Sequence, residues 1–245
     1  MNVEPTVQAK LLSLAAVDAE LNRLAHRRRT LPEQQEVDRL QTERNARKDA
    51  AVAVEIILDD LDRDIRKLEG EIEAVRMRAD RDRSMLQSGS VGSKQLTELQ
   101  HELTSLERRQ AALEDDLLEV MERREASKAD HDHAGAQVSQ VDDQIGDAVR
   151  ARDEAIADIE VAEQRCHSDR EALLAVFPAE LVTLYEKQRE KSGIGAALLQ
   201  ARRCGACRIE LDRGVIARIA AAPADLLVRC PECDAILVRT KESGL

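Results

Sequence analysis

The chain has 245 residues, which is enough for two compact domains. Charged residues make up 35% of it and aromatic residues only 1%, which excludes a core built on large aromatic side chains. The formal net charge of −11 opposes general affinity for nucleic acid, because phosphate groups favour clustered Lys and Arg. This composition is instead typical of long, surface-exposed helices.

The N-terminal residues Met1–Thr6 lack the basic and apolar regions of a signal peptide. The sequence also lacks a run of about 18 apolar residues that would span a bilayer. We therefore expect a cytoplasmic protein with no membrane association. In a reducing compartment, five cysteines, four of them in two C-x-x-C pairs, indicate metal ligands rather than disulfides.

Apolar residues recur at alternating steps of four and three from Val54 onward, which is the a/d heptad pattern of a coiled coil. The heptad positions are Val54, Leu58, Leu61, Ile65, Leu68, Ile72, Val75, Ala79, Asp82 and Leu86. The pattern extends back to Val37, weakened by polar residues. Pro32 suits the first turn of a helix, so we expect a break near Thr30 and a shorter helix before it.

The segment 87–93, with two glycines and three serines, interrupts the heptad and is typical of a turn. A second heptad starts at Leu96 and continues to Ile159. If the turn is centred near residues 90 and 91, the numbers of two facing residues sum to about 181. The chain then forms an antiparallel hairpin whose arms are on the order of 120 Å long. The alternative, a parallel homodimer of one very long helix, is disfavoured by the Gly/Ser turn.

Phe177 and Pro178 are expected to end the second arm, and a short helix is expected over residues 179–191. We therefore predict two domains. Residues 1–176 form the coiled-coil hairpin, with its turn near 87–94, and residues 177–245 contain the short helix and a zinc ribbon. The predicted fold is mainly α, a long antiparallel helical hairpin followed by a small C-terminal α+β module.

The strongest chemical signal is Cys204-Gly-Ala-Cys207, followed after 22 residues by Cys230-Pro-Glu-Cys233. Two such turns place four thiolates around one Zn²⁺ at about 2.3 Å. We expect one structural zinc, because four cysteines leave no open position for a catalytic water. The alternative, redox-active dithiols or disulfides, is disfavoured because the βαβ pattern of a thioredoxin-like protein is absent.

Between the two pairs, Asp212 is expected to cap a short helix over residues 213–221, which Pro223 ends. Residues 226–228 and 235–238 flank the second pair and are expected to form two short strands. A module this small has little core, so metal binding is expected to supply much of its folding energy.

Several features occur together: the heptad arms, the Gly/Ser turn before Leu96–Leu103, the stretch Leu184–Arg189, and the two cysteine pairs. In this combination the chain resembles the bacterial C4-type zinc ribbon proteins with an N-terminal coiled-coil hairpin, over essentially its whole length. Members usually continue the last pair with Gly-Arg-Ile-Leu-Tyr, whereas this chain has Asp234-Ala-Ile-Leu-Val238. It therefore lacks the Arg and the aromatic side chain that other members present there.

The resemblance implies that Cys204, Cys207, Cys230 and Cys233 hold the metal. It also implies a non-enzymatic adaptor without a small-molecule substrate. Members of the family are linked to transcription factors of the alternative sigma type, to flagellar or secretion regulation, and to RNA.

Our first hypothesis is thus a zinc-ribbon adaptor for protein–protein interaction, with a sigma factor or another transcription component as partner. The alternative is a regulator that binds RNA or DNA through the ribbon. The candidate contacts for nucleic acid or a partner are Arg202, Arg203, Arg208, Arg229 and Arg239. A third hypothesis is a factor that inserts its tip into the RNA polymerase secondary channel. It is disfavoured because residues 88–94 carry no carboxylate that would hold Mg²⁺.

Overall fold

The computed structural model describes residues 1–89 and 92–245. The predicted centre of the turn, residues 90 and 91, lies outside the described residues. Contacts divide the chain into two units: Met1–Glu33 with Arg150–Leu245 (unit 1), and Gln34–Val149 (unit 2). These boundaries differ from those of the predicted domains, because the N-terminal helix packs on strands of the C-terminal module within unit 1.

The helical part comprises α1 (Pro5–Arg29), α2 (Pro32–Gln87) and α3 (Ser93–Leu174). Thr30 ends α1, and its backbone N–H donates to the carbonyl oxygens of His26 and Arg27. The break predicted near Thr30 is therefore confirmed. Pro32 starts α2, where its missing N–H costs no helical hydrogen bond.

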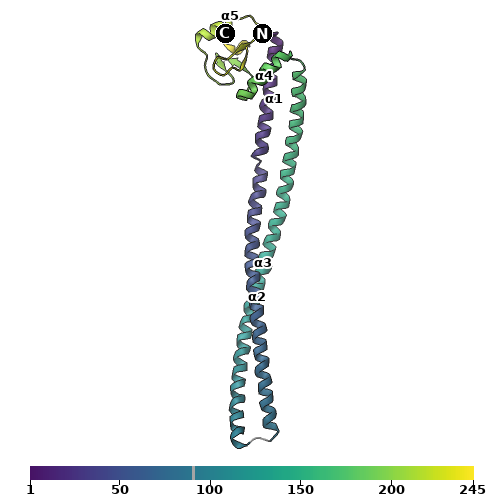
Figure 1. Ribbon diagram of the computed structural model, residues 1–245, viewed down its shortest axis with the longest axis vertical. Helices are drawn as coiled ribbons and strands as arrows, with labels where there is room; N and C mark the ends of the chain where they lie inside the picture. The colour runs from purple at the N-terminus through teal and green to yellow at the C-terminus, as the bar shows by residue number, and fades with distance from the viewer. Residues whose placement is uncertain (90–91) are drawn as a thin grey trace. The chain divides into compact units, whose positions relative to one another are not determined.

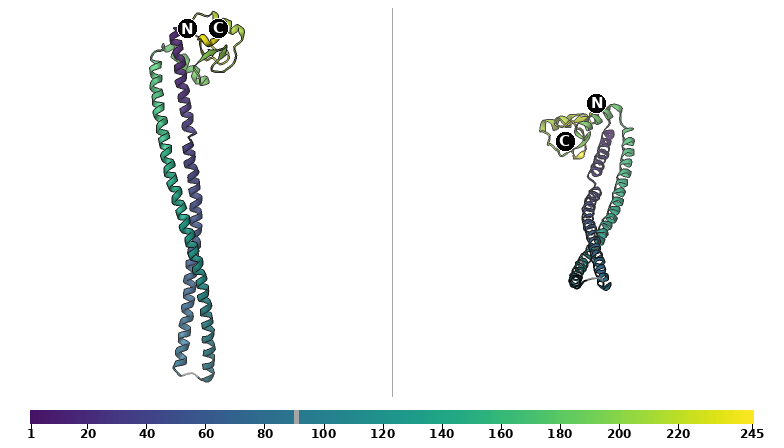
Figure 2. Two further views of the ribbon diagram at one scale, coloured as in Figure 1. Left: turned by 180° about the vertical axis from the view of Figure 1, so that it is seen from behind. Right: turned by 60° about the horizontal axis from the view of Figure 1, so that its bottom comes forward.

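Within unit 2, α2 and α3 lie side by side and antiparallel, as all views show (Figures 1 and 2). This confirms the predicted helical hairpin. The seam buries aliphatic side chains from both helices. They are Leu61, Ile72, Val75 and Ala79 of α2, and Leu99, Leu106 and Val141 of α3.

The register of the hairpin differs from the one expected from the midpoint of the turn. That midpoint would place Glu119 opposite Asp62, but Arg124 lies there, with Nε 2.9 Å from Asp62 Oδ1. The ion pair Arg44–Asp142 is displaced in the same direction.

Unit 1 contains the remaining elements. They are α4 (Ala179–Ser192), β1 (Ala196–Gln200), β2 (Arg203–Cys204), α5 (Arg213–Ala221), β3 (Val228–Arg229), β4 (Ile236–Val238) and η1 (Lys241–Ser243). The four strands form one sheet in the order β2-β1-β4-β3. β1 pairs with β4 in parallel, while the other two pairs are antiparallel. The small α+β module expected at the C-terminus is confirmed.

A buried polar contact holds α4 in place within unit 1. The Tyr185 hydroxyl donates to Asp18 Oδ2 at 2.7 Å, and Arg170 Nε donates to Asp18 Oδ1 at 2.8 Å. Burial, followed by the hydrogen bond from the Tyr185 hydroxyl to the Asp18 carboxylate, raises the pKa of Tyr185. The ring also packs on Gly195, where an added Cβ would lie 2.5 Å from the Tyr185 ring. Only glycine fits there, so Tyr185 of α4 packs closely against the backbone just before β1.

In the part of the chain that the structure describes, none of the helices is both long and apolar enough to cross a membrane.

Candidate metal centre

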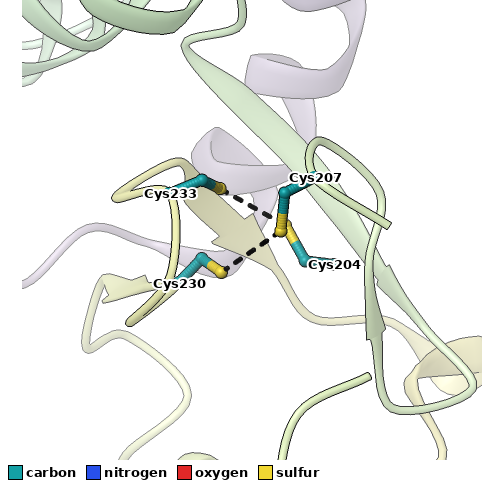
Figure 3. A group of neighbouring side chains, drawn as sticks. All are labelled: Cys204, Cys207, Cys230 and Cys233. Atoms are coloured by element: carbon teal, nitrogen blue, oxygen red, sulfur yellow. Dashed lines mark hydrogen bonds between the residues drawn. The ribbon is translucent and has the colours of Figure 1, made fainter. Parts of the chain in front are cut away.

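Four cysteine side chains from two segments converge in the C-terminal module (Figure 3). Cys204 ends β2 and Cys207 follows three residues later, while Cys230 directly follows β3 and Cys233 precedes β4. Their four sulfur atoms lie within 4.8 Å of one another. The sheet creates this arrangement, because it brings the two C-x-x-C turns to one place across 22 intervening residues.

The sulfur spacing fits a tetrahedral zinc ion. Cys204 Sγ lies 3.8 Å from Cys233 Sγ, and Cys207 Sγ lies 3.9 Å from Cys230 Sγ. A tetrahedron with Zn–S bonds of about 2.3 Å has sulfur–sulfur edges of about 3.8 Å. A disulfide would need about 2.05 Å. The residues therefore suit a closed, four-sulfur zinc site rather than two disulfides.

Both cysteine turns use the same backbone hydrogen bond. Arg208 N–H donates to the Cys204 carbonyl oxygen at 2.8 Å, and Asp234 N–H donates to the Cys230 carbonyl oxygen at 2.9 Å. Arg208 and Asp234 both adopt positive φ, at 61° and 64°. In the first turn, a Cβ on Gly205 would lie 2.7 Å from the Leu198 carbonyl oxygen, so glycine is required there.

The protein alone does not favour four ionised thiols. Burial raises the pKa of Cys204 to about 12 and also raises the pKa of Cys233. The backbone N–H of Ile209 lowers the pKa of Cys207. A bound zinc ion supplies the positive charge that keeps soft sulfur ligands deprotonated.

Comparison with known proteins identifies both parts of the chain. Residues 14–193 match the CT398-like coiled coil hairpin domain. The chain belongs to this family. Residues 203–237 match the C4-type zinc ribbon domain, so the four cysteines form a zinc ribbon with one structural zinc ion. The family resemblance predicted from the sequence is confirmed.

Similar proteins cover nearly the whole chain. Rv2229c of Mycobacterium tuberculosis is 50% identical over 232 residues, which is 95% of each chain. A solved structure from Mycobacterium smegmatis is 49% identical, with a TM-score of 0.89, and the match covers 98% of this chain and 100% of that one. CT398 of Chlamydia trachomatis shares the fold, with a TM-score of 0.68 at 18% identity, covering 95% of this chain and 97% of CT398.

The arginines predicted as contacts differ in whether their side chains already have partners in the structure. Arg203 pairs with Glu210 at 2.8 Å. Arg229 lies at the second cysteine turn, where Nε donates to the Asp234 carbonyl oxygen at 3.1 Å. The side chains of Arg202 and Arg208 make no hydrogen bond or ion pair within the described ranges 1–89 and 92–245.

Arg239 stabilises the fold of the ribbon through hydrogen bonds to the backbone. Its guanidinium donates to five backbone carbonyl oxygens at and after the C-terminus of α5, at distances from 2.6 to 3.2 Å. The accepting residues are Ile219, Ala222, Pro223, Ala224 and Leu226. These groups would otherwise lack partners at the helix end, so Arg239 is committed to the fold of the ribbon.

Helix α4 contributes to the zinc site in a way that the sequence analysis missed. Gln188 Nε2 donates to the Cys233 carbonyl oxygen at 2.7 Å, and Lys191 Nζ lies 3.1 Å from Asp234 Oδ2. Gln188 belongs to the stretch Leu184–Arg189 that carried the family resemblance. That resemblance was the one available signal, since no local pattern predicts a contact across 45 residues.

An open groove of about 300 Å³ lies on the ribbon between α5 and the segment that leads to the second cysteine turn. Its lining residues are Val215, Arg218, Ile219, Ala222, Leu226, Val228, Arg229 and Pro231. The groove thus combines aliphatic side chains with two arginines. The sequence analysis missed it because its lining comes from two segments that only the fold brings together.

Proposed function

We propose that the chain is a non-enzymatic adaptor whose zinc ribbon binds a short segment of a protein partner. The groove between α5 and β3 carries this proposal. It offers an aliphatic floor for an apolar side chain, and Arg218 and Arg229 for carboxylates beside that side chain. The expected ligand is therefore a peptide segment with one or two large apolar residues flanked by acidic ones.

The charges of the groove support an acidic ligand. Arg218 is exposed and forms no ion pair with any described residue. Arg229 shares Asp234 with Lys191, so the three side chains together keep one net positive charge. Arginine is also enriched at protein interfaces, where its planar group binds carboxylates in a bidentate manner.

The zinc ion has a supporting role in this proposal. Val228 and Pro231 line the groove on either side of Cys230. A closed set of four thiolates shapes this wall and leaves no coordination position for a substrate. Loss of zinc should therefore abolish partner binding. Components of the transcription machinery, including an alternative sigma factor, are the first partners to test.

The test compares two arginines on the same helix. Three zinc-loaded proteins, the wild type, Arg218→Glu and Arg213→Glu, are used to purify partners from native cells after nuclease treatment. Arg213 lies on α5 outside the groove and serves as the matched control. The partner is then purified and its affinity measured for each variant.

We expect one protein to be retained by the wild type and Arg213→Glu, with affinity at least tenfold lower for Arg218→Glu. Equal affinity of all three variants would overturn the groove as the binding site. Loss of all retained material after nuclease treatment would favour the second candidate, nucleic-acid binding.

That second candidate rests on Arg202, Arg208 and Arg213, whose side chains make no ion pair among the described residues. Binding through them would weaken steeply with salt, because each phosphate contact releases counterions. Arg203 pairs with Glu210 and Arg239 binds backbone carbonyl oxygens, which leaves a small basic surface. The groove therefore supports the adaptor better.

A further inference from the structure

One segment of α2 is apolar on all of its faces. Residues 51–58 read Ala-Val-Ala-Val-Glu-Ile-Ile-Leu, so seven of eight side chains are apolar. A helix that packs against one neighbour normally has apolar residues on one face and polar residues on the other. The 51–58 segment thus has more apolar surface than one neighbouring helix covers.

The structure shows that aliphatic side chains of this segment remain exposed. Val52, Ile56 and Ile57 have exposed fractions of 51%, 55% and 50%. Even the seam positions Ala51, Val54 and Leu58 are only half-buried. Contiguous aliphatic surface of this kind is uncommon on monomeric proteins and marks an interaction site.

Helix α3 cannot cover the segment, because its facing stretch has small or polar side chains. The ion pairs Arg44–Asp142 and Asp62–Arg124 bracket this stretch. Between them, residues 125–137 contain no Leu, Ile, Val, Met or aromatic residue. The seam there lacks the large apolar side chains that elsewhere fill it.

The charges on either side of the 51–58 segment have opposite signs. Residues 44–48 contain two arginines, one lysine and no acid, whereas residues 60–64 contain three aspartates and one arginine. If a second α2 packs antiparallel about residue 54, its residues 60–64 lie against 44–48 of the first. The same register places Val52 against Ile56. A parallel arrangement would instead set like charges against each other, which is unfavourable.

We propose that the 51–58 segment is a self-association site, at which α2 of a second copy of this chain packs antiparallel. Val52 and Ile56 form its apolar centre, and Lys48 and Asp59 on its two flanks select the direction. Lys48 and Asp59 are exposed and have no ion pair in the described part of the chain, so they are free to pair across the interface. This inference does not depend on the groove of the zinc ribbon.

Sedimentation equilibrium of the full, zinc-loaded chain over a range of concentrations provides the test. We expect a reversible monomer–dimer equilibrium for the wild type. Ile56→Glu should raise the dissociation constant at least tenfold. Val161→Glu is the matched control, because Val161 has a similar exposed fraction, 48%, and lies on α3 in unit 1. Circular dichroism confirms that both variants keep their helices.

A charge exchange tests the direction of packing. Lys48→Glu should weaken the dimer, and Lys48→Glu combined with Asp59→Lys should restore it, because the pair is exchanged across an antiparallel interface. A monomer at all concentrations would overturn the proposal, even if a different protein proved to bind at Ile56. A dimer that Ile56→Glu leaves intact, or a double variant that fails to recover, would also overturn it.

Discussion

The side-chain amide of Gln188 donates a hydrogen bond to the carbonyl oxygen of Cys233, over 2.7 Å. Helix α4 therefore contacts the backbone of the second cysteine turn, at a residue whose side chain is a zinc ligand. Lys191 and Asp234 add an ion pair at the same junction. The zinc site and α4 should consequently gain or lose stability together.

We expect Gln188→Leu to lower the free energy of unfolding by about 1–3 kcal/mol, because the Cys233 carbonyl oxygen would lose its partner. Zinc release to a chromophoric chelator should become faster in the same variant. Glu190 is an exposed position on the same helix, so Glu190→Leu should leave the free energy of unfolding and the rate of zinc release close to those of the wild type. If the two variants behave alike, the hydrogen bond does not stabilise the zinc site.

Removal of zinc should unfold the ribbon and spare the hairpin of unit 2. Structural zinc in small modules contributes on the order of 10 kcal/mol, whereas the α2–α3 seam lies outside the ribbon. Hydrogen exchange after chelation should show loss of protection in residues 196–243 and retained protection in the seam of unit 2. The same result is expected for Cys230→Ala.

Zinc binding should also weaken as the pH falls. Only thiolates bind zinc, and burial holds the pKa of the free Cys204 thiol near 12, so protons compete with the metal. Zinc affinity measured by competition with a chelator should therefore decrease from pH 8 to pH 6. An affinity that does not change over this range would contradict a four-thiolate site.

Tyr185 should make the fold sensitive to alkali. Burial and the Asp18 carboxylate raise the pKa of Tyr185 in the folded state. The neutral phenol therefore stabilises the fold fully below the unfolded pKa of about 10, and this stabilisation is lost as the pH rises further. Tyr185 is the only tyrosine and the chain has no Trp, so tyrosinate absorbance reports this group alone. Titration should show ionisation well above that of free tyrosine.

Tyr185→Phe separates this effect from other alkaline changes. The variant should lose about 1–3 kcal/mol at neutral pH, because Asp18 loses one donor, and should show a weaker loss of stability above about pH 10. A titration midpoint equal to that of free tyrosine would show that the buried contact with Asp18 does not form.

Asp82 is a weak point in the seam of the hairpin. Its side chain is only 8% exposed, and Oδ2 has no hydrogen-bond partner in the described residues. We expect Asp82→Leu to stabilise the protein by about 1–3 kcal/mol, because an unsatisfied carboxylate is replaced by an apolar side chain. Thermal unfolding measures the gain. Asp116→Leu, at an exposed position of α3, should give no such increase.

The elements that local patterns determine were predictable. The heptads predicted both arms, and Asp212 does cap α5, since its carboxylate accepts from the backbone N–H groups of Gly214 and Val215. The paired cysteines predicted a single metal site because their spacing already limits the geometry. Within each heptad, each cysteine pair and the helix cap, the decisive residues lie within a few positions of one another.

Features that depend on distant partners were not predictable. The apolar run 196–199 of β1 is mostly buried but too short for its periodicity to separate helix from strand, so β1 was missed. The partner expected for Asp62 from the midpoint of the turn was wrong by about five residues, since Arg124 pairs with it. The task of Arg239 depends on carbonyl groups at least 13 residues away in the chain.

The arrangement around Arg239 also decides how the ribbon is best isolated. The match to the zinc ribbon domain stops at residue 237, yet five carbonyl oxygens at and after the C-terminus of α5 accept from Arg239, and Ser243 Oγ donates to the Leu199 carbonyl oxygen at 2.8 Å. A fragment cut at the domain match would keep every zinc ligand and still leave these acceptors without donors. A piece that keeps these contacts extends through Ser243, and it also includes α1 and α4, because α1 packs on β1 and β4 and Gln188 of α4 donates to the Cys233 carbonyl oxygen.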